Sequence, residues 1–245
     1  MGVRQHESVA ISTANVSCRE MGLDLDIEYR LHGAEVDRID QTLTPFLPLA
    51  SLTAWILRRP TVARSSTDCQ ALIGASRAAQ LLSSSSPEIK GRKCTAEVAQ
   101  IAPRGTGIWF SRGVDSLGAL YENFDEIDFL LGLEFIDAPY AGERQRAIWA
   151  ETVAAASGTG KPLFHLSTNA RDLVDTLAGW DYTHSAVFSG LGLFLSPVLQ
   201  RAWLAGGHRE STSTFQPSNR SDEQNAWSSS FVAVGQPPGE TRRTE

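Results

Sequence analysis

The regular alternation of strand-like and helix-like segments between residues 105 and 205 is the feature that most constrains the fold. Short apolar runs with the length of strands lie at 107–110, 127–135, 162–166 and 202–205. Segments with helical spacing of apolar residues follow them at 115–123, 142–156, 169–177 and 184–199. Strands separated by helices of about 10–15 residues predict βαβ units. We therefore expect an α/β fold in which a parallel sheet is sandwiched by helices, and the alternation alone does not give the order of its strands.

The chain divides by composition into three parts. Residues 1–102 predict a smaller mixed α/β region, with a strand at 23–31, a helix at 67–82, a serine-rich turn at 83–87 and a strand at 93–101. Residues 103–230 contain the strand–helix alternation and a polar segment that begins near residue 206. Residues 231–245 predict a disordered tail, because the stretch from residue 235 (GQPPGETRRTE) lacks the apolar side chains needed to pack.

Charge and composition restrict the class of partner. The 28 acidic and 22 basic residues give a net charge of −6, so no general attraction to nucleic acid or anionic lipid is expected. The longest apolar runs are shorter than the roughly 20 residues of a membrane span, and the first residues do not resemble a secretory signal. Cys18, Cys69 and Cys94 are too far apart for a zinc knuckle or a dithiol. We expect a cytoplasmic protein without a membrane partner, and the sequence leaves homo-oligomerisation open.

The residues with the clearest chemical potential lie in the turn after the strand 107–110. Residues 108–120 (IWFSRGVDSLGAL) run from an apolar strand through a sharp polar turn into a helix. A turn at the carboxyl end of a parallel strand faces the ligand crevice, and the following helix presents backbone N–H groups there. Two serine hydroxyls, a glycine that admits an anion, an arginine charge and a capping aspartate complete the set: Ser111, Arg112, Gly113, Asp115 and Ser116. This set favours a phosphate or pyrophosphate ligand.

The turn FSRGVDSL, residues 110–117, resembles the S-G-G-x-D-S signature of the PP-loop ATP pyrophosphatase superfamily. Further similarity to a bacterial branch of that superfamily lies in K-P-L at 161–163, T-N-A-R at 168–171 and A-W-S-S at 226–229. The resemblance covers about residues 105–230. It implies the adenine nucleotide α-hydrolase fold, with the strand 107–110 at the centre of the sheet and with ATP and Mg²⁺ as cofactors.

The resemblance also implies an activity. The protein would cleave ATP between the α and β phosphates, adenylate a carboxylate or amide-type oxygen of a small-molecule acceptor, and release pyrophosphate. An amine or sulfur donor would then displace AMP. The pyrophosphate would be held by Ser111, Arg112, Gly113, Val114, Asp115 and Ser116, and the adenosine would border Leu133 and Glu134. Asn169, Arg171 and His184 would face the acceptor or the α-phosphate, and the catalytic residues would be Arg112, Asp115, Arg171 and His184.

The chain departs from this family at two points, and two alternatives to the ligase stay open. Arg112 stands where the signature has its first glycine, and the chain continues after Trp227 into a polar tail instead of a cysteine-containing segment. These departures are compatible with a nucleotide-binding module without turnover. A second alternative is a tRNA-thiolating enzyme. The net charge and the lack of paired cysteines count against that alternative.

The sequence predicts no dedicated metal site, because no set of His, Cys or Asp residues has the spacing of transition-metal ligands. Magnesium would arrive with ATP, with Asp115 as a candidate ligand. His32 is expected on a surface turn, and His165 is expected inside a strand as a packed neutral imidazole. His184 and His208 fall where the crevice should lie.

Two glycine-containing motifs indicate structure rather than nucleotide binding. Residues 157–162 (SGTGKP) lack the upstream glycine and the hydroxyl residue of a Walker A loop, so a helix C-cap is expected there. Gly190 and Gly192 lie within an apolar helix, where close packing is the expected reason for glycine.

The polar segment 206–230 predicts a lid over the crevice. It begins at the carboxyl end of a strand, on the same side of the sheet as the Ser111 turn. We expect Trp227 to pack back against the α/β domain as an anchor. Residues of this segment would then close over the phosphates or the acceptor: Gly206, Gly207, His208, Arg209 and Ser211.

Overall fold

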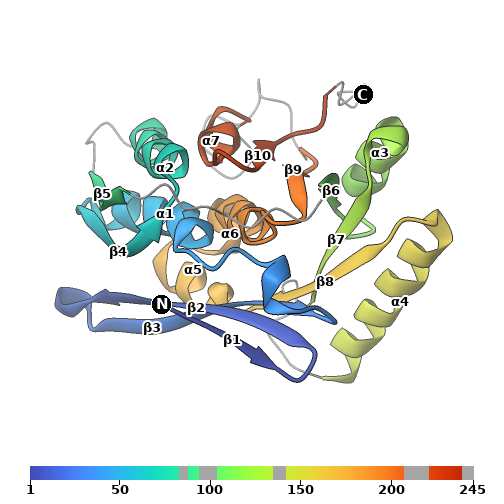
Figure 1. Ribbon diagram of the computed structural model, residues 1–245, viewed down its shortest axis with the longest axis horizontal. Coiled ribbons are helices and arrows are strands. Elements are labelled where there is room, and N and C mark those ends of the chain that lie inside the picture. Colours follow the sequence, from blue (N-terminus) through green and yellow to red (C-terminus); the bar gives the residue numbers. More distant parts are fainter. Residues whose placement is uncertain (83–87, 94–103, 135–141, 207–220, 239–245) are drawn as a thin grey trace.

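The computed structural model describes residues 1–82, 88–93, 104–134, 142–206 and 221–238. Within these residues, eight strands form one sheet in the order β1-β2-β3-β8-β7-β6-β9-β10, and two more form a small parallel sheet, β4-β5. Figure 1 shows the large sheet curving around a group of helices, with the N-terminal strands at one end. The predicted α/β class, with a largely parallel sheet flanked by helices, is confirmed.

Five strands make the parallel half of the sheet: β6 (Gly105–Trp109), β7 (Phe129–Glu134), β8 (Leu163–Thr168), β9 (Leu199–Trp203) and β10 (Ala233–Gly235). β6 pairs with β7 on one side and with β9 on the other, both in parallel. The predicted central place of this strand is therefore confirmed. Numbered from β6, the strand order is 3-2-1-4-5, which is a doubly wound order whose direction reverses between β6 and β9.

The helices cover two faces of this sheet. α3 (Val114–Glu122) and α4 (Glu143–Thr159) lie on the outer face, and α5 (Ala170–Leu177) and α6 (Trp180–Phe194) lie on the inner face (Figure 1). On the outer face, Leu120 packs with Ile108 and Leu130. The inner face belongs to the larger core, which includes Leu173 and Val187. Alternate residues of the strands thus point into both cores, which explains why the run 127–135 is almost wholly apolar.

Three antiparallel strands extend the sheet: β1 (Gly2–His6), β2 (Val9–Cys18) and β3 (Leu23–His32). β3 matches the predicted strand and pairs antiparallel with β8, so the sheet continues across the predicted domain boundary at residue 102. β1 and β2 were not predicted. The core-facing residues of β2 include Ala10, Ser12 and Ala14, which are small or polar and give little hydrophobic signal.

The rest of the N-terminal half packs above the inner helices. It consists of α1 (Leu47–Leu57), β4 (Thr61–Thr67), α2 (Cys69–Leu82) and β5 (Ile89–Lys93). Short 3₁₀ helices lie at Arg19–Met21, Val36–Arg38 and Thr44–Phe46. A further 3₁₀ helix, Phe124–Glu126, lies later in the chain, between α3 and β7. α2 confirms the predicted helix. The predicted turn 83–87 and all but the first residue of the predicted strand 93–101 lie outside the described residues. No helix of the described ranges is both long enough and apolar enough to span a bilayer.

The predicted boundary between the last helix and the last strand of the alternation was wrong. α6 begins at Trp180 and ends at Phe194, and β9 begins at Leu199, three residues before the predicted strand. Residues 186–199 form one apolar run, and periodicity alone does not separate a buried helix from a buried strand in such a run. Pro197 stands in the turn between them, where it prevents continuation of the helix.

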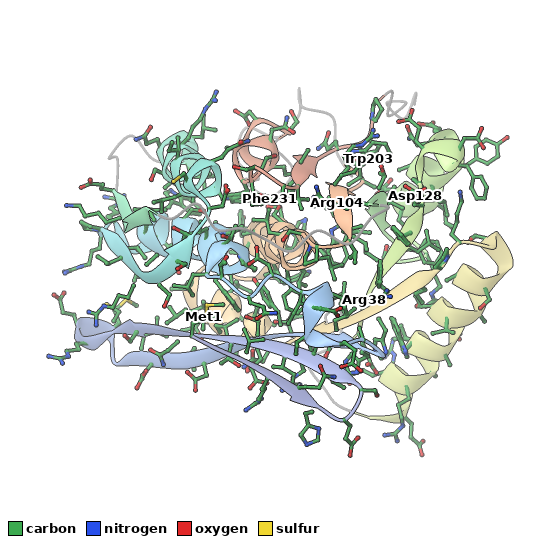
Figure 2. All side chains as sticks on the ribbon, viewed as in Figure 1. Met1, Arg38, Arg104, Asp128, Trp203 and Phe231 are labelled. Atoms are coloured by element: carbon green, nitrogen blue, oxygen red, sulfur yellow. The ribbon has the colours of Figure 1, made fainter. Side chains whose placement is uncertain are left out.

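The start of the predicted tail is ordered, which corrects the prediction that residues 231–245 are disordered. β10 pairs in parallel with β9, and α7 (Ser221–Ala226) precedes it. Val232 and Val234 are buried, and this short alternation suffices for an edge strand. Arg104 Nη2 also donates to the carbonyl oxygens of Leu199 and Phe231, which lie on the two segments that it joins (Figure 2). Residues 239–245 lie outside the described ranges.

Trp227 packs back against the α/β core, as predicted. Its side chain is 1% exposed. Its indole Nε1 donates to Ser51 Oγ at 2.8 Å, and Ser51 in turn donates to the carbonyl of Pro48 at 2.7 Å. The anchor therefore binds to α1, an element of the N-terminal half.

Candidate functional site

The Ser111 loop (Ser111–Ser116) joins the carboxyl end of β6 to the start of α3, at the edge where the strand order reverses. Its polar groups face one another. Ser111 Oγ lies 3.2 Å from Ser116 Oγ, Ser116 Oγ lies 3.0 Å from the carbonyl of Gly113, and the Gly113 N–H points to Ser111 Oγ at 3.3 Å. Ser111 is exposed and Ser116 is buried. The loop is a compact polar turn at the carboxyl ends of the parallel strands.

The first helical turn of α3 favours a negative charge. Gly113 occupies the N-cap position, which therefore lacks a capping side chain, and Asp115 lies in the first turn. Val114 is 73% exposed, so the backbone at the start of α3 is near solvent. The expected cap by Asp115 is thus replaced at the N-cap by a glycine, and the positive end of the helix dipole faces the loop.

Arg112 takes a left-handed backbone conformation, with φ of +64°. Glycine adopts this region at little cost, whereas other residues adopt it at a cost of about 1 kcal/mol or more. The guanidinium contacts Glu151 of α4 through Nη1 at 2.6 Å. Arg112 thus spans from the loop to the outer helix, and its charge is partly offset there.

Leu133 and Glu134 lie at the end of the neighbouring strand. Trp109 of β6 is in register with Leu131 of β7, and the N–H of Phe110 donates to the Leu131 carbonyl at 3.0 Å. Continuing this register places Ser111 beside Leu133. The structure therefore brings the two residues predicted to border adenosine to the same edge as the loop.

Two other predicted residues gather around Trp180 on the inner face. The Arg171 guanidinium carbon lies 5.6 Å from the Trp180 ring centroid, and the His184 ring lies 5.7 Å from it. Phe188 connects this group to β6, because its ring lies 5.8 Å from Trp180 and 4.7 Å from Trp109. Trp109, the member of this aromatic group that lies on β6, is two residues before Ser111.

Asn169, predicted to face the acceptor, is used to hold β3 against the end of β8. Its Oδ1 accepts from the N–H of Glu28 at 2.8 Å, and its Nδ2 donates to the carbonyl of Asp26 at 2.8 Å. Both ends of the amide thus continue the pairing of strands. Gly206 ends a described segment, whereas Gly207, His208, Arg209 and Ser211 lie outside the described residues.

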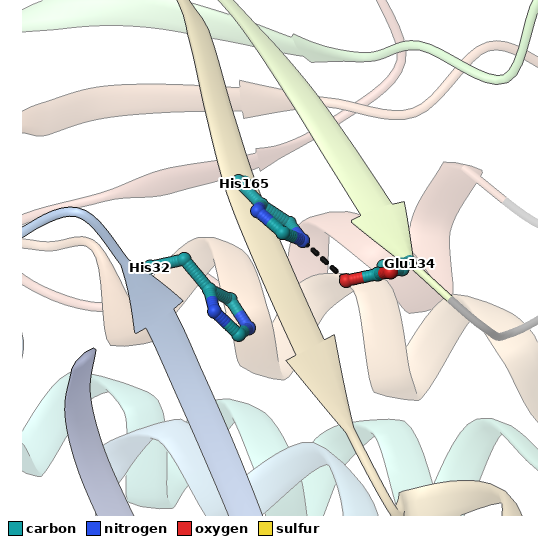
Figure 3. A group of neighbouring side chains, drawn as sticks. All are labelled: His32, Glu134 and His165. Atoms are coloured by element: carbon teal, nitrogen blue, oxygen red, sulfur yellow. Dashed lines mark hydrogen bonds and ion pairs between the residues drawn. The ribbon is translucent and has the colours of Figure 1, made fainter. Parts of the chain in front are cut away.

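A second group of polar side chains, which we call the histidine cluster, was not predicted: His32, Glu134 and His165 (Figure 3). His165 Nε2 lies 2.5 Å from Glu134 Oε2, and the His32 ring stacks on the His165 ring with centroids 4.0 Å apart. Trp149 of α4 stacks on His165 at 4.2 Å. His32 Nε2 also contacts Ser167 Oγ at 2.8 Å.

The three members come from three different strands, β3, β7 and β8, which explains why spacing in the sequence gave no signal. The expectation for His32 was wrong: it ends β3 half-buried against His165, not on a surface turn. Glu134, predicted to border adenosine, belongs to both groups. One ligand atom from each residue of the cluster lies within 4.8 Å of the others.

Burial keeps the imidazoles of this cluster neutral. It lowers the pKa of His165 to about 4, which confirms the predicted neutral imidazole inside a strand. Burial and the neighbouring His165 also lower the pKa of His32, against the opposite effect of Glu134. Burial raises the pKa of Glu134, and His32 counteracts this. Near neutral pH each imidazole therefore carries a proton on one ring nitrogen, and the other nitrogen keeps its lone pair.

The two glycine motifs have the structural roles predicted for them. Gly160 is the C-cap of α4 with φ of +71°. A Cβ at Gly190 would lie 2.5 Å from the carbonyl oxygen of Pro45, and one at Gly192 would lie 2.7 Å from Ala202 Cβ. Close packing therefore requires both glycines of α6.

A cavity of about 480 Å³ lies elsewhere, between β2, α1 and β4. Its lining includes Phe46, Leu57, Arg59 and Arg64. No residue of the Ser111 loop or of the histidine cluster lines it, so it does not belong to the predicted site.

Comparison with known proteins identifies no relative: no family model, curated protein or solved structure matches this chain.

Proposed function

We propose that this chain is an ATP-dependent, AMP-forming ligase whose nucleotide binds at the Ser111 loop. The observation that supports this most is the position of the loop. It follows the central parallel strand, where the strand order reverses, and it places two hydroxyls at the N-terminus of α3. Ligands of doubly wound sheets bind at this position, and phosphates bind at helix N-termini.

In this proposal the β and γ phosphates lie against the loop. The N–H of Gly113 and the hydroxyls of Ser111 and Ser116 turn from one another to the phosphate oxygens. Mg²⁺ is carried by the phosphates, with Asp115 in the first turn of α3 as its candidate ligand. Leu133 and Glu134, on the adjacent strand, border the adenosine.

The proposed reaction depends on position and charge rather than on a covalent enzyme intermediate. A carboxylate or amide-type oxygen of the acceptor attacks the α phosphorus, and the bond between that phosphorus and the bridging oxygen breaks, so pyrophosphate leaves with its electron pair. An amine or sulfur nucleophile then displaces AMP. Arg171 and His184, which gather at Trp180, supply charge and a proton-transfer group on the acceptor side.

The first prediction tests the loop by a double substitution, Ser111→Ala with Ser116→Ala. Each hydroxyl contributes a hydrogen bond to a charged group, so the loss of both should weaken binding of Mg-ATP by about 100-fold or more. Isothermal titration calorimetry measures the affinity. Pyrophosphate release over a panel of carboxylic acids and amines measures turnover.

Ser157→Ala is the matched control. Ser157 is an exposed serine of α4 that donates to the carbonyl of Val153 at 2.9 Å, away from the loop. This variant should bind Mg-ATP as the parent protein does. Unchanged affinity in the Ser111/Ser116 variant, with the fold intact by circular dichroism, would contradict the assignment.

Arg112 favours a second candidate, a nucleotide-binding module without turnover. Its guanidinium is committed to Glu151, and its Nε is buried without a hydrogen-bond partner among the described residues. An arginine held in this way shapes the loop, but its guanidinium is not free to stabilise the charge that develops in a transition state. Binding of Mg-ATP without AMP formation, across the whole panel of acceptors, identifies the module.

A further inference from the structure

We propose that His32, Glu134 and His165 form a binding site for a divalent transition metal of the zinc class, with a coordination position left open for water or substrate. This site is distinct from the magnesium that accompanies ATP. The proposal stands on the histidine cluster alone and does not require the Ser111 loop to bind a nucleotide.

The geometry supplies the ligands from rigid elements. Each residue lies on a different strand of the same sheet, so the backbone positions of all three are fixed by strand pairing: β3 with β8, and β8 with β7. Figure 3 shows the His32 and His165 rings side by side and the Glu134 carboxylate at the end of β7, joined to His165. The three ligand atoms lie within 4.8 Å of one another.

The adjustment that a metal requires is small. Ligand atoms at about 2.0–2.1 Å from zinc are separated from one another by about 3.3 Å in a tetrahedral site. The Glu134–His165 pair, at 2.5 Å, must open by less than about 1 Å, and the stacked His32 ring must turn so that its lone pair meets the same point. The proposal requires that rotation of these side chains about their own bonds makes both changes.

Charge also favours a cation here. The side chain of Glu134 is a carboxyl group that is only 12% exposed, in contact with His165. A carboxylate enclosed in this way carries a desolvation cost, which a bound metal ion offsets. The indole of Trp149 covers one side of His165 and limits the access of water.

The ligand set selects the class of metal. Two imidazoles and one carboxylate suit Zn²⁺, Fe²⁺, Co²⁺ or Ni²⁺, whereas Mg²⁺ and Ca²⁺ prefer sets made of oxygen. Three protein ligands leave at least one position open, as in catalytic rather than structural zinc sites. Ser167 Oγ lies beside His32, and this hydroxyl can donate a hydrogen bond to a water at that position or accept one from it.

The test uses metal-free protein, prepared by dialysis against a chelator, and Co²⁺ and Zn²⁺ as probes. We expect one Co²⁺ per chain, with visible absorption typical of a site of low coordination number, and displacement of Co²⁺ by Zn²⁺. Glu134→Gln and His32→Gln should each weaken binding by more than about 100-fold, beyond the roughly 10–100-fold that loss of an outer-shell group costs. His6→Gln, which changes an exposed histidine of β1, should bind Co²⁺ unchanged.

Trp149 provides a second measurement. Because its ring stacks on His165, bound Co²⁺ should quench its fluorescence. In Trp149→Phe the quenching should be lost while one Co²⁺ still binds. Circular dichroism and the melting temperature without metal establish that each variant is folded, and only the variants with an intact cluster should gain melting temperature on adding Zn²⁺.

Two results would overturn the site. One is no stoichiometric uptake of Co²⁺ or Zn²⁺ at micromolar concentrations by the folded parent protein. The other is uptake that survives Glu134→Gln and His32→Gln, which would place the metal elsewhere on the chain. Neither result depends on ATP, so failure of the metal site and failure of the proposed ligase activity are distinguishable.

Discussion

Asp40 is a carboxyl group almost fully enclosed by protein, with 1% of its surface exposed. Its oxygens accept from the N–H of Thr42 at 2.7 Å and from Ser196 Oγ at 3.2 Å. Burial raises the pKa of Asp40 more than these hydrogen bonds lower it, and Asp68 adds to the increase. The residue thus ties the segment after β3 to the end of α6, at the cost of keeping a charge out of water.

A second prediction is that Asp40→Asn stabilises the protein near neutral pH. Because the pKa of Asp40 is raised by folding, the folded state holds the proton at pH values where the unfolded chain has released it, and the free energy of unfolding falls as pH rises through that interval. Asparagine does not ionise, and it can keep both contacts, since its oxygen can accept from Thr42 and its amide can donate to Ser196 Oγ. Urea unfolding at about pH 8 and about pH 4, close to the ordinary carboxyl pKa, measures the difference.

The advantage of Asp40→Asn should shrink toward the lower pH, where the parent residue is protonated as well. Asp37→Asn is the control, because Asp37 is an exposed carboxyl group three residues earlier. It should change the free energy of unfolding little at either pH. If Asp40→Asn lowered stability more at pH 8 than at pH 4, the carboxylate would be a stabilising charge and the interpretation would be wrong.

Individual residues were predictable from the sequence where their role is local. The Ser111 turn and the C-cap at Gly160 depend on neighbours a few positions away, so patterns of residues indicate them. His32 and Glu134 are brought together by strand pairing across more than 100 positions. Their alignment depends on registers that a single sequence does not reveal.

At the scale of elements, α7 depends on a close contact with α2. A Cβ at Gly74 of α2 would lie 1.8 Å from the carbonyl oxygen of Ala226, the last residue of α7. α7 continues into buried Trp227 and then into β10, which pairs with β9. The smallest residue of α2 therefore sets how closely the last helix and the last strand approach the rest of the protein.

A third prediction is that Gly74→Ala loosens this C-terminal segment. The added methyl group cannot be placed without moving the backbone of α7, and overpacking of this kind costs about 1–3 kcal/mol. Hydrogen exchange should increase in residues 221–238 while β6 and β7 keep their protection. Gly118→Ala in α3 is the matched control, since a Cβ there meets nothing within 4 Å. It should stabilise the protein by up to about 1 kcal/mol. Unchanged exchange in 221–238 would contradict the dependence of α7 on Gly74.

Helices and strands were predictable where the spacing of apolar residues clearly indicated one type of secondary structure. The strands β6, β7 and β8 and the helices α2 to α5 have clear periodicity and clear breaks, and their predicted positions agree with the structure within a few residues. β1 and β10 were missed because they are short edge strands, and β2 was missed because its buried side chains are mostly small or polar. The boundary between α6 and β9 was misplaced because both are almost wholly buried, which removes the alternation of polar and apolar residues.

At the scale of the whole molecule, the two halves of the sequence share one hydrophobic core. Tyr29 of β3 stacks on Phe46 at 4.5 Å and meets the edge of Phe194 at the end of α6 at 5.9 Å. Leu166 of β8 and Trp227 are buried in the same cluster. The division at residue 102 follows a change in composition. Side chains from before and after this residue nevertheless pack together in one core and shield each other from water.

The last prediction is that residues 103–245, expressed alone, do not form a stable native domain. Without residues 1–102, the inner faces of β8 and α6 lose Tyr29 and Phe46, and β8 loses β3 as its antiparallel neighbour. Exposure of this much apolar surface and of a strand edge favours a loosely packed or aggregated state. The fragment should bind a hydrophobic dye and lack near-ultraviolet circular dichroism, whereas the full chain should unfold in one cooperative transition. Adding the fragment 1–102 should restore part of the near-ultraviolet signal, because it returns the missing half of the core. If residues 103–245 alone gave a native near-ultraviolet spectrum and a sharp transition, the parallel half would carry its own sufficient core, and the boundary indicated by composition would also be a boundary of folding.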